Sequence, residues 1–146
     1  MGRTATGVNA IRLDTWDKLA GADVVTEGDD LFVITEKGAG KRTPLDEYRR
    51  QSRYGMGVKA MNLSPETTGA IVGARVVSDG DEVTLISSNG IILRTEARLI
   101  SQQGRATRGV RIMDLRDGDA VASMAVIQVA ALTTTDGECR SPTRQR

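Results

Sequence analysis

The chain has 146 residues, of which 39% are hydrophobic and 3% aromatic, and its 20 basic and 19 acidic side chains leave a net charge of +1. This length fits one domain or a piece of a larger one, and so small a net charge excludes a uniformly basic nucleic-acid binder. The absence of histidine excludes His-based acid–base catalysis and His metal sites, and the single cysteine, Cys139, excludes an internal disulfide. No apolar run approaches the roughly 18 residues of a membrane helix, so we expect a cytoplasmic protein with no membrane partner.

The first predicted elements, in chain order, are a glycine-rich segment at 2–8 and then four short strands, at 19–25, 31–35, 39–43 and 58–63. An acidic turn around Gly28 separates the first two strands, and Lys37-Gly38 provides the hairpin turn, where glycine supplies a positive φ. Residues 44–51 are expected to form a short turn or loop rather than a helix. A second glycine-rich segment, 52–58, leads into the last strand of this unit.

The next stretch repeats this order, with strands predicted at 71–77, 83–87, 91–95 and 110–115. Asn89-Gly90 is the strongest short hairpin signal in the chain. The third glycine-rich segment is 104–110, and a further strand follows at 120–130. Residues 133–146 lack strand periodicity, so we expect a disordered polar tail there.

An internal repeat ties these elements together. Residues 19–63 align with 71–115 at a constant offset of 52, and 16 of the 45 positions are identical. Four short strands repeated about every 50 residues predict an all-β, propeller-like fold of four-stranded blades, about two of them complete. We expect 1–13 to end a preceding blade, 14–66 and 67–118 to form blades, and 119–132 to start a following blade or act as a closing strand.

The charges follow the repeat. Residues 14–30 hold six acids and one lysine, whereas 41–59 and 94–116 each hold six bases and two acids. Basic residues at one phase of a repeat share one rim, where they could bind phosphates by counterion release; a solvated rim paired with the acidic turns is the alternative. The candidate DNA-binding residues are Lys41, Arg42, Arg49, Arg50, Arg53, Lys59, Arg94, Arg98, Arg105, Arg108 and Arg111.

Other motifs give weaker evidence for a functional site. Gly55 and Gly57 could let the backbone cradle a phosphate, or could simply form a tight turn. The stretch 38–43 resembles a phosphate loop superficially, but Lys41 is followed by arginine instead of serine or threonine. Acidic clusters at 27–30 and 79–82 are typical of turns between strands, so we expect no metal and no cofactor.

Residues 41–48, 51–58, 92–95 and 104–110 together resemble the C-terminal domain of the bacterial DNA gyrase A subunit, and the same repeat occurs in the topoisomerase IV A subunit. The resemblance covers about residues 1–127. It implies a β-pinwheel, a disc of about six blades with strands exchanged between neighbours. It also implies that the basic rim binds, bends and wraps duplex DNA, supporting supercoil control beside the cleavage core of an ATP-dependent type IIA topoisomerase.

The residues that match the family's gyrase box are Gln51, Arg53, Gly55 and Gly57, while Ser52, Tyr54 and Met56 depart from it. The chain resembles a C-terminal fragment of such a protein, with no catalytic residue of its own. The implied partners are double-stranded DNA, the cleavage region and the ATPase subunit, in a bacterial, nucleoid-associated setting. We expect the unpaired blade edges of a fragment to promote self-association. The alternative function is a propeller-like protein-interaction scaffold that does not bind DNA.

Overall fold

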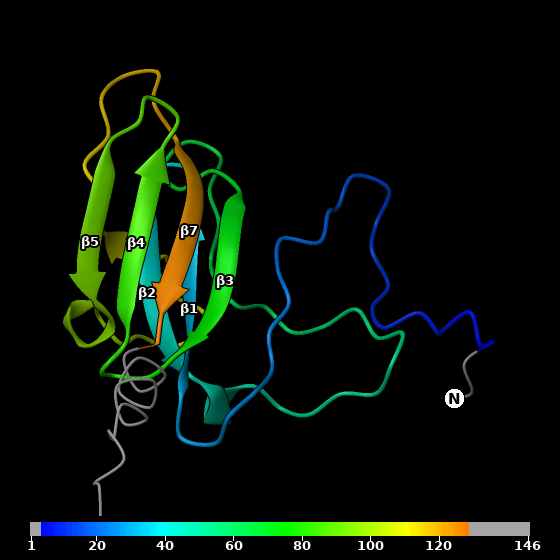
Figure 1. Cartoon of the computed structure of the whole chain (residues 1–146). Helices are drawn as coiled ribbons and strands as arrows, with labels where there is room; N and C mark the ends of the chain where they lie inside the picture. Colours follow the sequence, from blue (N-terminus) through cyan, green and yellow to red (C-terminus); the bar gives the residue numbers. More distant parts are fainter. Residues whose placement is uncertain (1–3, 129–146) are drawn as a thin grey trace, which may run out of the picture.

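The computed structural model describes residues 4–128 and consists of two antiparallel sheets (Figure 1). This confirms the all-β, propeller-like fold class. One sheet has the order β3-β1-β2-β6 and the other the order β5-β4-β7. The strands are β1 (Asp30–Thr35), β2 (Ala39–Pro44), β3 (Ile71–Val77), β4 (Glu82–Ser87), β5 (Ile92–Glu96), β6 (Val110–Arg111) and β7 (Val121–Ile127). Short 3-10 turns, η1 (Leu45–Glu47) and η2 (Ala97–Leu99), follow β2 and β5, in place of a longer helix.

The hairpins of the two sheets have the same register, in which each residue pair of the second hairpin is the counterpart of a pair in the first, 52 residues earlier. In the β1–β2 hairpin Ile34 pairs with Gly40, and in the β4–β5 hairpin Ile86 pairs with Ile92. The third strand of each sheet comes from the start of the next sequence unit, as β3 beside β1 and β7 beside β4. Strands are therefore exchanged between units, as the resemblance implied, and the sheets do not coincide with the sequence units.

One hydrophobic core joins the sheets. Alternation of buried and half-buried residues along β4 follows the pleat, which turns every second side chain inward. The buried core residues are Phe32, Ile34, Val77, Val83, Leu85, Ala97, Ile100, Met113 and Val121. Because these residues come from both repeats, the core fixes one blade against the next.

Two predicted strands, 19–25 and 58–63, do not form. Both segments run beside the sheets as extended loops (Figure 1), and Val24 and Val25 in the first are exposed. Their counterparts 71–77 and 110–111 are strands because β1 and β2 offer open edges to them. The segment 19–25 lies along β3, the outermost strand of its sheet, but contacts it through the Asp23 side chain instead of a backbone ladder, and 58–63 forms no ladder with any strand of the described residues. The predicted strand 110–115 is likewise shortened to Val110–Arg111.

The predicted tail, 133–146, lies outside the described residues. Within them, the hydrogen bonds that join the segment 19–25 to the sheet are made by Asp23. Its Oδ2 accepts hydrogen bonds from Arg75 Nε at 3.0 Å and from the Val76 amide at 3.1 Å. These donors, with the Val24 amide, lower the pKa of the Asp23 carboxyl; the Val76 amide has the largest effect. The contact holds the segment along β3.

Candidate nucleic-acid interface

A repeated backbone hydrogen bond links the chain that leaves each glycine-rich segment to the next glycine-rich segment. The Arg12 amide donates to Gly55 O at 2.9 Å, and the Asn62 amide donates to Thr107 O at 2.9 Å. The donors are 50 residues apart and the acceptors 52, which are the spacings that separate Arg3, Arg53 and Arg105 in the sequence. The chain leaving one segment therefore packs against the next segment.

Each segment also has a glycine in the left-handed region at the same place. The φ angles of Gly7, Gly57 and Gly109 are 88°, 82° and 79°. A side chain at Gly109 has no room, since its Cβ would lie 2.7 Å from Gly40 O. The turn conformation is thus a requirement of the backbone, which supports the tight-turn interpretation of these glycines.

Lys41 holds the third segment in place. Its side chain is fully buried, and its Nζ donates to the carbonyl oxygens of Gly104 at 2.5 Å, Arg105 at 2.8 Å and Thr107 at 3.2 Å, and to Thr107 Oγ1 at 3.1 Å. Burial lowers the pKa of the Lys41 ammonium, and the Glu47 carboxylate acts in the opposite direction. The lysine supplies the donors that these converging oxygens need.

Arg42 is buried on the same strand. Its Nη1 lies 2.8 Å from Asp30 Oδ2 and 2.7 Å from Asp79 Oδ1, and its Nε donates to Ile100 O at 2.9 Å. The expectation that Lys41 and Arg42 lie on a DNA-binding surface is therefore corrected: in this structure both are interior and bind protein oxygens. The reason is strand exchange, which covers β2 with the following glycine-rich segment.

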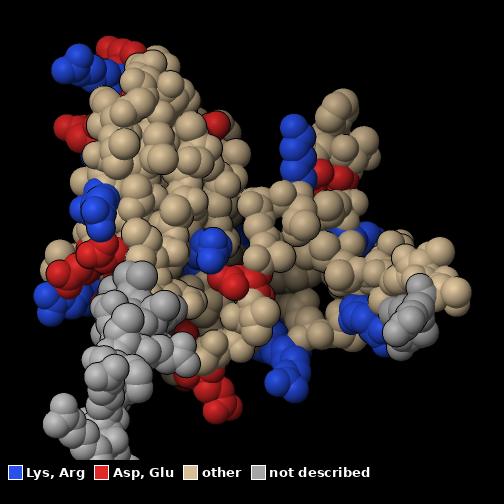
Figure 2. All heavy atoms as spheres, viewed as in Figure 1, with Lys and Arg blue, Asp and Glu red and all other residues tan. Residues whose placement is uncertain are grey.

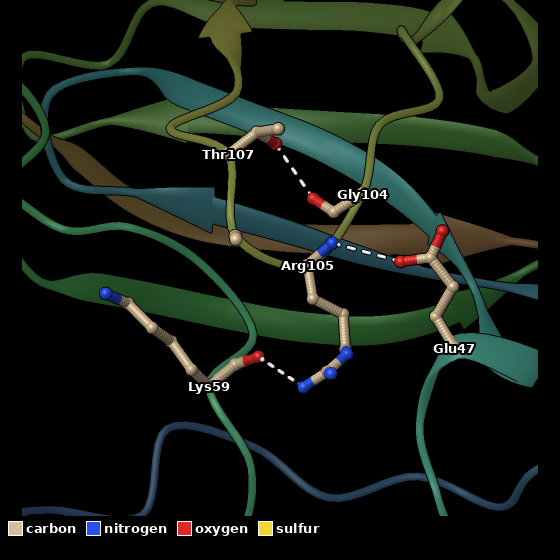
Figure 3. Close-up of a pocket in the computed structure, with 6 residues that line it drawn as sticks. Glu47, Lys59, Gly104, Arg105 and Thr107 are labelled. Carbon is tan, nitrogen blue, oxygen red and sulfur yellow. Dashed lines mark hydrogen bonds between the residues drawn. The ribbon is translucent and has the colours of Figure 1, made fainter.

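Arg105 lines a hollow of about 450 Å³ together with Glu47, Lys59 and residues 104–107 (Figure 3). Its amide donates to Glu47 Oε2 at 3.1 Å and its Nη1 donates to Lys59 O at 3.3 Å, both visible in Figure 3. Its guanidinium also lies 5.9 Å from the ring centroid of Tyr48, within cation–π range. Burial raises the pKa of the Tyr48 hydroxyl. Arg105 thus stabilises the third glycine-rich segment, and its side chain is also partly exposed to solvent.

The other candidate bases are exposed and fall into two groups. In the first group, Arg94 pairs with Glu82, Arg98 with Glu96, and Arg111 with Asp114, while Lys59 Nζ donates to Asn62 Oδ1 at 3.2 Å. In the second group, no side-chain hydrogen bond or ion pair is formed to any residue within 4–128. These four are Arg49, Arg50, Arg53 and Arg108.

The distribution of charge on the visible face is mixed. Figure 2 shows Lys and Arg side chains at separate places, interspersed with acidic ones, both over the sheets and over the extended segments beside them. Three of the unpaired arginines, Arg49, Arg50 and Arg53, lie within five residues of chain, just before and at the start of the second glycine-rich segment. Residues 49–53 are therefore where unpaired positive charge is most concentrated along the described chain.

The residues that resemble the gyrase box lie in an exposed loop. Gln51 and Arg53 are exposed, Gly55 is half-buried and Gly57 has the left-handed φ given above. Tyr54 has a φ of 63°, the one positive value among the described residues other than glycine. This conformation is costly for a bulky residue. The departure of Tyr54 from the box thus places an exposed, strained aromatic residue beside Arg53, which the sequence pattern did not reveal.

No cluster of three or more His, Cys, Asp or Glu that could hold a metal occurs between residues 4 and 128. In the same part of the chain, no helix has the length and apolar character to cross a membrane.

Comparison with known proteins agrees with this geometry. Residues 1–26, 29–78 and 81–128 match the family described as the DNA gyrase C-terminal domain, beta-propeller. The chain is 49% identical over 129 residues to the DNA gyrase A subunit of Kosmotoga olearia, covering 87% of this chain and 16% of that protein. It is 36% identical over 143 residues to the DNA gyrase A subunit of Staphylococcus aureus, covering 97% of this chain and 16% of that protein. The chain thus spans about a sixth of the length of these curated relatives.

Solved structures give the same assignment. A DNA gyrase A C-terminal domain superposes with a TM-score of 0.64 at 31% identity, covering 68% of this chain and 33% of the other. The C-terminal domain of a DNA topoisomerase IV superposes with a TM-score of 0.79 at 20% identity, covering 90% of this chain and 43% of the other, which supports the fold alone. With nearly every described residue inside the family match, the chain belongs to the DNA gyrase C-terminal domain family.

Proposed function

We propose that this chain binds duplex DNA through the phosphate backbone and bends it, as the C-terminal region of a type IIA DNA topoisomerase. The observation that carries the proposal is the group of exposed arginines without a protein partner within residues 4–128, Arg49, Arg50, Arg53 and Arg108. An unpaired guanidinium on an exposed loop binds phosphate bidentately without first breaking an ion pair.

The placement of these arginines supports phosphate contact rather than base recognition. They lie at glycine-rich turns that follow one another through the contacts of Arg12 with Gly55 and of Asn62 with Thr107. A duplex that follows successive turns must curve with them, and the energy of curving depends on the deformability of its sequence. Binding is then nearly independent of base sequence, apart from this bending preference.

The wider role rests on the relatives. We propose that residues 14–66 and 67–118 act as repeating units of a DNA-wrapping rim in a gyrase-type protein. In that setting the chain supports supercoil control on cytoplasmic, chromosomal DNA, while the cleavage region and the ATPase subunit supply the chemistry. The role we assign to the charged residues of the described chain is binding and curvature of the duplex.

A second candidate function is a protein-interaction scaffold. It is favoured by the large apolar side chains exposed on the N-terminal segment, where Trp16 is 91% and Val24 81% exposed. Such a scaffold needs no affinity for nucleic acid, and its exposed apolar side chains would be covered by a protein partner.

Duplex binding separates the two functions. Fluorescence anisotropy with duplexes of about 30 base pairs, in three unrelated sequences, measures affinity, and energy transfer between labelled duplex ends measures bending. The arginine variant carries Arg49→Ala, Arg50→Ala and Arg53→Ala. The control variant carries Lys18→Ala, Lys37→Ala and Arg116→Ala, three exposed bases elsewhere. We expect similar affinity for all three sequences, a large loss in the arginine variant and a small loss in the control. Absence of duplex binding by the unmodified chain would reject the proposal in favour of the scaffold.

A further inference from the structure

Arg53 and Tyr54 form a turn in the second glycine-rich segment, in the part of the chain that runs out beside the sheets between β2 and β3 (Figure 1). The Tyr54 side chain is 56% exposed, and that of Met56, two residues later, is 61% exposed. An exposed aromatic ring therefore stands next in the chain to an exposed arginine that has no partner within residues 4–128.

The exposure of Tyr54 is a property of the turn itself. Its counterpart Ala106 lies in the same turn of the third glycine-rich segment, which Lys41 ties to β2. Lys41 binds the carbonyl oxygens of that segment, and Ala106 stays exposed. Arg108, the counterpart of Met56, is exposed too. Packing of a glycine-rich segment against a strand thus leaves both positions open to solvent.

The fold does not require an aromatic residue at this turn. Tyr54 has a φ of 63°, a conformation that glycine adopts without strain and that a bulky side chain disfavours. Alanine is sufficient for the same turn at position 106. Strained backbone of this kind clusters at ligand-binding sites. The Tyr54 ring serves neither the turn nor the core, so it is available to a ligand.

The residues before the ring in the chain are basic. Three arginines without a partner in the described part of the chain, Arg49, Arg50 and Arg53, lie within five residues of Tyr54. Trp16 is the contrasting case, because it is 91% exposed but has acidic neighbours at 14 and 17. Among the aromatic residues of the described chain, Tyr54 alone combines an exposed ring with unpaired positive charge.

We propose that this turn binds single-stranded DNA, with one unpaired base stacked on the Tyr54 ring and the neighbouring phosphates bound by the arginines of residues 49–53. In a duplex each base is stacked between its neighbours, so its face is closed to the ring. An unpaired base presents that face, and an exposed aromatic ring beside basic side chains binds it whatever the base. The inference rests on the proposed function for the phosphate-binding role of the arginines and adds a separate ligand for the ring.

Fluorescence anisotropy with a labelled single strand of about 12 nucleotides tests the stacking. The variant is Tyr54→Gly, because glycine keeps the left-handed turn and removes the ring. We expect it to weaken single-strand binding by about fivefold or more, while Tyr54→Phe, which retains a ring, binds like the unmodified chain. The slope of log Kobs against log salt concentration should stay the same in Tyr54→Gly, because no phosphate contact is removed. Its affinity for the duplex should also stay the same.

A strand of abasic nucleotides separates stacking from charge. It keeps every phosphate but has no base to stack, so the unmodified chain and Tyr54→Gly should bind it equally. The control variant is Trp16→Ala, which removes a more exposed ring from acidic surroundings and should leave single-strand binding unchanged. Urea denaturation checks that each variant is folded.

Equal affinity of Tyr54→Gly and the unmodified chain for the normal single strand would overturn the proposal. A loss of the same size on the abasic strand or on the duplex would also overturn it, because neither offers a free base to the ring. If the unmodified chain binds the duplex and Tyr54→Gly shows no loss on the single strand, the stacking alone fails. If only the single strand is bound, and through Tyr54, the proposed duplex function fails and the stacking stands; if neither DNA is bound, both fail.

Discussion

Replacing Lys41 with leucine removes the ammonium that binds four oxygens of the third glycine-rich segment. Leucine is the residue at the counterpart position, Leu93, so the strand itself accepts it. An ammonium has three N–H donors, and a hydrogen bond to a charged group contributes a net of about 1.5–3 kcal/mol. The cost of burying the ammonium offsets part of this, and water can reach part of the released turn. We therefore expect the free energy of unfolding to fall by about 2–4 kcal/mol.

Urea denaturation measures this loss, and amide hydrogen exchange locates it. The Asn62 amide, which donates to Thr107 O, should lose protection as the segment detaches. Lys37→Leu is the control, because Lys37 is exposed and its Nζ donates only to Glu66 O among the described residues; its effect should stay within about 0.5 kcal/mol. A Lys41→Leu change below about 1 kcal/mol, with unaltered Asn62 protection, would refute the role assigned to the buried lysine.

Three further outcomes are expected. Tyr54→Gly should raise the free energy of unfolding by about 1 kcal/mol by relieving the left-handed backbone, whereas Tyr54→Ala should not; equal urea midpoints for both variants would contradict the strain. Gly109→Ala should destabilise the fold by more than Gly118→Ala in thermal melting, because both residues have positive φ but only Gly109 has a backbone oxygen against its Cβ position; equal losses would contradict this contact. The lowered pKa of Asp23 means that its stabilisation is complete above its ordinary pKa near 4 and is lost as pH falls through the lowered value. The urea midpoint of Asp23→Asn should therefore fall less than that of the unmodified chain over that pH range, and parallel curves would count against the contact.

The hairpins could be predicted because their signals are local. The turns at Gly38 and Gly90, with the strands on either side, lie close to where glycine and alternating residues indicate them. The strands at 19–25 and 58–63 could not be excluded in the same way. Their residues resemble those of 71–77 and 110–115, and the difference lies in whether a backbone ladder forms with a neighbouring strand: 19–25 lies along the outer edge of β3 but contacts it through the Asp23 side chain.

The candidate site was predicted in part. The exposed arginines at the second glycine-rich segment lie where a rim would need them, but a charged residue does not reveal its partners, so the burial of Lys41 and Arg42 was missed. The repeat did contain a signal for Lys41. Its counterpart one repeat later is Leu93, and an apolar counterpart indicates a position in the protein interior. Arg42 and Arg94 gave none, since the two are identical in the repeat and differ in burial.

The salt dependence of duplex binding tests the central claim most directly. Log Kobs is measured against log salt concentration for the unmodified chain, the arginine variant and the control variant. Each phosphate contact contributes about 0.9 to the slope, so loss of Arg49, Arg50 and Arg53 should make it shallower by about 2.7, while the control keeps a slope close to that of the unmodified chain. Equal slopes for the arginine variant and the unmodified chain would contradict phosphate binding by these three arginines.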